Sequence, residues 1–177
     1  MPELPEVETT VRAIDKFENH ILEEIIIHNR NLRWEVETKV QSLTKRKLVV
    51  KITRRAKYIL IYLDDNCLMI HLGMSGKLRI QNNADNYFKK HDHAELVFKN
   101  EKIVFNDVRR FGSIHLSKNP QKHRLIKNLG VEPLSRAFNK FYLKNICENS
   151  NLCIKKLIMD QKYVVGVGNI YASESLF

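Results

Sequence analysis

Short β-branched and aromatic runs, separated by turn residues, follow one another from about Ile21 to Leu116. No helical periodicity interrupts them, and strands that succeed one another without helices pair antiparallel and pack as sandwiches. The sequence therefore predicts an α+β chain whose N-terminal part is an antiparallel β sandwich. The predicted strands cover residues 48–53, 58–63, 68–72, 77–80, 94–98, 103–106 and 113–116.

Helices are predicted on both sides of this strand region. Val7, Val11, Ile14 and Phe17 form one apolar stripe at helical spacing, which predicts a helix over residues 5–17. After Leu116, short helices are predicted over 124–129, from an N-cap at Ser135 to 148, over 152–161, and from 170 onward. We therefore expect a sandwich domain over 1–117, a linker over 118–134 and a helical domain over 135–177.

The composition favours an anionic partner. The chain carries 30 Lys and Arg against 20 Asp and Glu, a net charge of +10, which suits DNA but suits a ribosomal contact equally. No apolar run is long enough to cross a bilayer, and no signal peptide opens the chain, so a cytoplasmic protein without a membrane partner is expected. Three cysteines without a CxxC pair predict neither a disulfide framework nor a zinc site built within this chain.

The extreme N-terminus reads Met1-Pro2-Glu3-Leu4-Pro5-Glu6. Removal of the methionine would leave a secondary amine on Pro2. An α-amino group titrates near roughly pH 8, so part of it is neutral and nucleophilic at physiological pH. Glu3 lies next to it and can move protons. From the residues alone, the alternative is an ordinary helix start.

Two further segments combine basic or apolar side chains with turns. Residues 54–58, RRAKY, are either a phosphate-binding cluster or a solvated charged turn. Residues 71–76, HLGMSG, contain two glycines that permit a sharp turn and could expose Met74 as a wedge between bases. The alternative for this second segment is a hairpin turn with a methionine in the core.

Three more segments are ambiguous by themselves. In a strand, His91 and His93 of KHDH would share a face without a third ligand, so a metal site is not expected. Arg109, Arg110 and Phe111 in RRFG combine phosphate contacts with stacking. The GVGN turn at 166–169 leads into a helix whose backbone N–H groups can hold a phosphate.

The order and spacing of these segments resemble a known family. PELPEVET from residue 2, RRAKY, HLGMSG, KHDH, RRFG and VVGVGNIYASESLF occur as in bacterial formamidopyrimidine-DNA glycosylases, and the resemblance spans the whole chain. It implies a β sandwich followed by a helix-two-turns-helix domain. The implied activity is base-excision repair as DNA-formamidopyrimidine glycosylase and DNA-(apurinic or apyrimidinic site) lyase. The implied partner is double-stranded DNA containing oxidised purines, such as 8-oxoguanine and formamidopyrimidines, or abasic sites, bound by a monomer in the bacterial cytosol or nucleoid.

The resemblance also implies roles for individual residues. Pro2 would form the Schiff base, Glu3 would protonate the opened sugar, and Lys57 would hold phosphate and donate a proton during β-elimination. Phosphates would be held by His71 and Asn169, and His91 and Arg110 would contact DNA. Met74, Arg109 and Phe111 would fill the space that the flipped nucleotide leaves, while Glu6 and Lys155 would lie near the extruded base.

Two departures from the family pattern accompany this resemblance. Residues 149–151 are polar where the family carries a basic DNA contact, and the family continues beyond residue 177 with a four-cysteine hairpin that binds one zinc ion and assists δ-elimination. No cofactor or metal is therefore expected in this chain. We expect the 177 residues by themselves to be loosely folded at the C-terminal end, with little turnover and weak DNA binding. The alternative function is thus an inactive truncated fragment.

Overall fold

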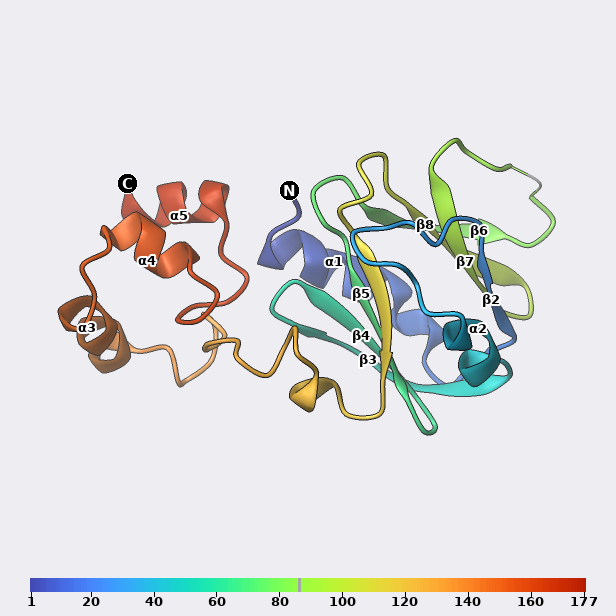
Figure 1. Cartoon of the computed structure of the whole chain (residues 1–177), viewed down its shortest axis with the longest axis horizontal. Coiled ribbons are helices and arrows are strands. Elements are labelled where there is room, and N and C mark those ends of the chain that lie inside the picture. The colour runs from blue at the N-terminus through green and yellow to red at the C-terminus, as the bar shows by residue number, and fades with distance from the viewer. Residues whose placement is uncertain (86) are drawn as a thin grey trace.

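The computed structural model describes residues 1–85 and 87–177, and its larger part is a sandwich of two antiparallel sheets (Figure 1). The first sheet has the order β1-β3-β4-β5-β9 and the second has the order β2-β7-β8-β6. The predicted α+β class with an antiparallel sandwich is confirmed. The strands are β1 (Ile21–Leu22), β2 (Glu24–Ile27), β3 (Lys47–Arg55), β4 (Tyr58–Leu63), β5 (Cys67–His71), β6 (Lys77–Asn82), β7 (Asp92–Val97), β8 (Glu101–Asn106) and β9 (Ser113–Ser117).

The central strands of the first sheet are buried on both faces. Ile59 and Ile61 of β4 point into the core between the sheets, together with Ile70 of β5. Leu60 and Met69 lie on the other face, in a second apolar cluster that also holds Ile126. Burial on both faces explains why these strands read as continuous apolar runs instead of alternating ones.

Helix α1 (Leu4–Ile14) packs its predicted apolar stripe against the sandwich. Val7, Val11 and Ile14 are at most 7% exposed and belong to the main core. The last predicted turn is the 3-10 helix η1 (Asp15–Phe17), which buries Phe17. Short helix α2 (Lys39–Thr44) also packs against β2. The chain's N-terminal end thereby lies beside the β5–β6 and β8–β9 loops (Figure 1).

A smaller helical part follows the sandwich. It contains α3 (Lys140–Glu148), α4 (Ile154–Met159) and α5 (Asn169–Leu176), and its own small core centres on Ile146, Leu157 and Val164. Figure 1 shows it beside the sandwich, connected by a long segment that includes the 3-10 helix η2 (Pro120–Lys122). Within the described ranges 1–85 and 87–177, no helix is long and apolar enough to cross a bilayer.

In this second half one predicted helix is absent, and another is present with a different N-cap. Residues 124–128 form turns, and directly after them the chain is held by long-range contacts: Arg55 binds the carbonyls of Leu129 and Gly130, and the Gly130 N–H donates to Gln161 O. A helix of so few residues is too weak to compete with these contacts.

The helix predicted from Ser135 begins later. Asn139 is its N-cap, and its side-chain oxygen accepts hydrogen bonds from the N–H groups of Phe141 (3.0 Å) and Tyr142 (3.1 Å). Ser135 instead closes a local turn by donating to Glu132 O. Both residues are good caps, so only the tertiary path of the chain distinguishes them.

Candidate active site

Glu3 joins the two parts of the molecule. Its carboxylate is 2% exposed and accepts hydrogen bonds from the N–H groups of Gly168 (2.7 Å), Ile170 (2.9 Å) and Tyr171 (3.2 Å) at the start of α5. A negative charge is favourable at this end of a helix. A Cβ on Gly168 would lie 2.4–2.8 Å from Glu3 side-chain atoms, so glycine is required for this approach. The N-terminus and the glycine turn, far apart in sequence, are thus in direct contact.

Two cavities meet at the N-terminus. Met1 lines both a cavity of about 280 Å³, which also contacts Lys57, His71 and Gly168, and a larger one of about 750 Å³. Pro2, the next residue in the chain, is half-buried. The larger cavity is bordered by Arg33, His71, Met74, Arg109, Arg110 and Phe111. A reactive group at the position of Met1 would therefore face both spaces.

Lys57 is buried beside this point. It is 7% exposed, and its Nζ donates a hydrogen bond of 3.3 Å to Val167 O of the glycine turn. Burial lowers the pKa of the Lys57 ammonium, an effect that the charges of Glu3 and Glu6 partly offset. A lysine with a lowered pKa exchanges its proton more readily near neutral pH than a solvated one.

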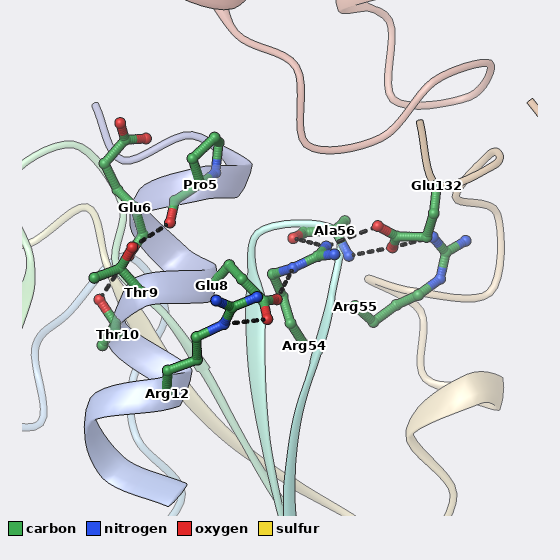
Figure 2. Close-up of polar contacts among 10 residues, drawn as sticks. All are labelled: Pro5, Glu6, Glu8, Thr9, Thr10, Arg12, Arg54, Arg55, Ala56 and Glu132. Atoms are coloured by element: carbon green, nitrogen blue, oxygen red, sulfur yellow. Dashed lines mark hydrogen bonds and ion pairs between the residues drawn. The ribbon is translucent and has the colours of Figure 1, made fainter. Parts of the chain in front are cut away.

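The other basic residues of the RRAKY segment have a different role. Figure 2 shows that the Glu132 carboxylate faces the β3–β4 turn and accepts hydrogen bonds from Arg54 Nη1 (2.7 Å), Arg55 Nη1 (2.8 Å) and Ala56 N–H (2.7 Å). Glu8 of α1 binds Arg54 Nε at 3.0 Å. Both guanidinium groups are therefore used inside the protein, and of the three basic residues only Lys57 lies at the cavity.

Glu132 was missed by the sequence reasoning, although the sequence contains a signal. It is the only acidic residue between positions 108 and 147, in a segment rich in Lys and Arg. Burial raises the pKa of Glu132, but the bonds from Ala56, Arg54 and Arg55 outweigh burial, and the pKa lies below its usual value. Glu132 thus remains ionised and holds the linker on the turn that precedes Lys57.

His71 is a neutral side chain in this setting. Burial, together with the charges of Lys57 and Arg33, lowers the pKa of its imidazole to about 4. The N–H of Gly73 donates to Nδ1 at 3.0 Å, which leaves Nε2 as the protonated ring atom. His71 can therefore offer a hydrogen bond at the cavity wall without adding a positive charge.

The apolar and cationic tips predicted for two loops are exposed. Met74 lies in the β5–β6 turn and is 41% exposed, while Phe111 lies in the β8–β9 loop and is 42% exposed. The Arg109 guanidinium stacks over the Phe111 ring at 4.7 Å, and Arg110 beside them is also exposed. All four side chains border the larger cavity, so the two loops form one edge of it.

The KHDH segment differs from its prediction. His91 lies before β7 with a left-handed backbone (φ +76°), so it does not share a strand face with His93. Asp92 is buried in an ion pair with Arg79 at 2.7 Å, and His93 Nε2 bonds to Asp107 O at 2.7 Å. These two side chains are committed to the fold, whereas Lys90 is exposed and His91 remains partly open to a ligand.

The remaining predicted site residues lie on three helices: Glu6 on α1, Lys155 on α4 and Asn169 on α5. Glu6 accepts hydrogen bonds from Glu3 N (2.9 Å) and the Tyr171 hydroxyl (3.3 Å). Lys155 Nζ donates to Ser173 Oγ at 2.9 Å, and Asn169 is the exposed first residue of α5. Asn169 is therefore adjacent to the Glu3 contact, whereas Lys155 belongs to α4 and reaches α5 through Ser173.

The cysteines do not assemble a metal site. Cys67 is buried in the sheet, Cys147 and Cys153 are exposed, and all three are free. In the part of the chain that the structure describes, no three His, Cys, Asp or Glu side chains gather where they could hold a metal ion. The residues present therefore do not fit the four-cysteine zinc site that the sequence resemblance implies for the longer family members.

Two family descriptions match this chain. "Formamidopyrimidine-DNA glycosylase N-terminal domain" matches residues 1–114, and "Formamidopyrimidine-DNA glycosylase H2TH domain" matches residues 129–177. The proteins named formamidopyrimidine-DNA glycosylase from Cronobacter sakazakii and Legionella pneumophila are each 47% identical over all of this chain. The chain spans 66% and 65% of their lengths, just under two thirds.

Solved structures of similar proteins have the same fold. The complex of Lactococcus lactis Fpg with DNA containing an abasic site has a TM-score of 0.87 at 32% identity, over 98% of this chain and 65% of that one. A complex of a mutant of the Lactococcus lactis protein with DNA containing Fapy-dG has a TM-score of 0.88 at 33% identity, over 99% of this chain and 66% of that one.

Proposed function

Because this chain belongs to the formamidopyrimidine-DNA glycosylase family, we propose that it carries the catalytic centre of a base-excision repair glycosylase and AP lyase for oxidised purines. The observation that carries the proposal is that Met1 and the buried Lys57 line one cavity between the sandwich and the helical part, where Glu3 is buried against the start of α5. The partner is duplex DNA with 8-oxoguanine, formamidopyrimidines or abasic sites. The protein works in the bacterial cytosol or nucleoid.

The chemistry starts on Pro2 once Met1 is removed. The Pro2 nitrogen attacks sugar C1′ and forms the N–C1′ bond, the bond from C1′ to the base breaks, and the base leaves with a proton. The ring bond between C1′ and O4′ then opens as Glu3, after taking up one proton from solvent, delivers it to O4′, which leaves an iminium on Pro2 and returns Glu3 to the carboxylate. Loss of a C2′ proton and departure of the 3′ phosphate complete β-elimination, with Lys57 as the nearby proton carrier.

The DNA is bound so that the damaged nucleotide can leave the helix. A base inside the duplex shields C1′, so the nucleotide must be flipped out first. Lys57, His71 and Asn169 hold phosphates around the lesion, and Met74, Arg109 and Phe111 fill the vacated space, with Arg109 facing the orphaned cytosine. Arg110 and His91 contact the flanking DNA. Glu6 and Lys155 lie toward the extruded base.

Covalent trapping tests this proposal. The chain with Met1 removed is incubated with a duplex containing one 8-oxoguanine opposite cytosine, in the presence of borohydride, and the adduct is located by peptide mass spectrometry. We expect DNA attached to Pro2, because reduction converts the iminium to a stable amine. One extra residue before Pro2 turns this amine into an amide and should abolish trapping, whereas Pro120→Ala, remote from the site, should preserve it.

Each outcome of the trapping experiment has a clear meaning. DNA attached to a lysine, with Pro2 unmodified, would reject the assignment of the nucleophile. Binding to the lesion duplex without any adduct would reject catalysis by this chain and support the alternative of a DNA-binding fragment.

A further inference from the structure

A buried carboxylate lies at the base of the β8–β9 loop. Asp107 is fully buried, and its carboxylate accepts hydrogen bonds from Ser75 Oγ (2.5 Å), from Gly112 N–H (2.7 Å) and from Arg109 N–H (3.3 Å). Ser75 belongs to the other loop, the β5–β6 turn, and its oxygen also accepts from Arg109 N–H at 3.0 Å. Asp107 therefore closes its own loop and binds the neighbouring one.

The two loops also pack backbone against backbone. Gly73 has φ +65°, and a Cβ there would lie 2.4 Å from the Phe111 carbonyl carbon and 2.5 Å from Gly112 N. A Cβ on Gly112 would in turn lie 2.6 Å from the Phe105 ring. Such approaches are open only to glycine, so neither loop can shift against the other without losing close contacts. In Figure 1 the loops lie side by side at the end of the sandwich near the N-terminus.

The base of this arrangement is fixed, while its tip is exposed. The Asp107 main chain is held as well, because its N–H donates to His91 O (3.1 Å) and its carbonyl accepts from His93 Nε2 (2.7 Å). Beyond this base, Met74 and Phe111 are each about two-fifths exposed. A rigid support under exposed apolar side chains is the geometry that a wedge needs, since unstacking bases resists insertion.

We propose that Ser75 and Asp107 are positioning residues that join the two loops into one rigid wedge, so that Met74 and Phe111 enter the base stack together. The inference rests on the proposed function, because it concerns how the damaged nucleotide is kept out of the helix. Neither residue touches DNA in this role. They act through Arg109, Phe111 and Met74.

The test compares Ser75→Ala with the matched control Ser113→Ala. Ser113 is also buried, at the start of β9, but its hydroxyl has no hydrogen-bond partner among the residues that the structure describes. Two duplexes are titrated with each variant: one with an intact 8-oxoguanine opposite cytosine, and one with a preformed abasic site. A 2-aminopurine next to the lesion reports unstacking by its fluorescence.

Ser75→Ala should weaken binding to the intact lesion duplex about tenfold, the loss expected from one hydrogen bond to a charged group, and should reduce the 2-aminopurine signal. Binding to the abasic-site duplex should change by less than about twofold, because there the unstacking cost is already reduced. Ser113→Ala should leave both affinities and the signal unchanged. Equal losses on the two duplexes would mean a general structural role and would overturn the proposal.

A measurement without DNA keeps the inference separate from the proposed function. Hydrogen exchange of the Arg109 and Gly112 amides should accelerate in Ser75→Ala and remain slow in Ser113→Ala, because only the first loses the link between the loops. Unchanged exchange at both amides would overturn the coupling. A wild-type chain that binds lesion and undamaged duplex equally would overturn the proposed function instead.

Discussion

Glu132→Ala should destabilise the protein through the turn before Lys57. The carboxylate receives two guanidinium groups and the Ala56 N–H, and its side chain is only 24% exposed. After its removal, Arg54 keeps Glu8 and Ala56 O, and Arg55 keeps Leu129 O and Gly130 O. The Ala56 N–H has no such replacement.

These contacts determine how much free energy of unfolding Glu132→Ala should lose. An orphaned N–H costs about 1–3 kcal/mol, and removing one member of a buried ion pair costs about 3–5 kcal/mol. Because both arginines retain other acceptors, we expect a loss of about 2–4 kcal/mol in the free energy of unfolding. Ala56 itself has a left-handed backbone (φ +52°), which the Glu132 contact helps to hold.

Urea titration monitored by circular dichroism and by the single tryptophan, Trp34, measures this loss. Glu148→Ala is the matched control, because the Lys144–Glu148 pair is 3.6 Å long with side chains 72% and 63% exposed. The control should change stability by less than about 0.5 kcal/mol. A loss below about 1 kcal/mol for Glu132→Ala would refute the reasoning.

The loss of stability in Glu132→Ala should also depend on pH. The pKa of Glu132 is lower in the folded protein than in the unfolded chain, so its contribution is present above the unfolded value and disappears as the pH falls through the folded one. The difference between wild type and Glu132→Ala should therefore be full at pH 7 and shrink below about pH 4.5. A difference that grows on acidification would contradict the assigned direction of the shift.

Two further predictions concern DNA binding. Lys57→Ala should weaken binding to damaged and undamaged duplex alike and flatten the slope of log affinity against log salt by about one unit. His71→Ala should weaken binding without changing that slope, because the imidazole with a pKa of about 4 is uncharged at pH 7. Equal salt slopes for the two variants would contradict this assignment. Phe111→Ala should impair binding to an intact lesion duplex more than binding to a preformed abasic site, and titration of both duplexes would reject the wedge role if the losses were the same.

Local sequence patterns were enough to predict most strands of the sandwich. The strand predicted over 58–63 is β4 with the same bounds, and the stripe from Val7 to Ile14 is the buried face of α1. These elements follow from side-chain periodicity and β-branched composition, which act within a few residues. The order of the motifs also indicated the family that the comparisons confirm.

The tertiary structure decided which charged residues are free to act. In sequence, Arg54, Arg55 and Lys57 form one basic cluster, but Glu132 from the linker takes up both arginines and leaves the lysine at the cavity. Arg55 also binds the carbonyls of Leu129 and Gly130, directly after the turns that stand in place of the helix predicted over 124–129. Partners more than seventy residues away cannot be read from a local pattern.

The sequence by itself thus determined the sandwich, the first helix and the family. Only the folded chain decided that Glu3 bonds to the start of α5, that His71 is neutral, and that Asp107 links two loops. The physical reason is that periodicity reports how each segment meets its own neighbours, whereas burial, ionisation and hydrogen-bond partners depend on which distant segments the fold brings together.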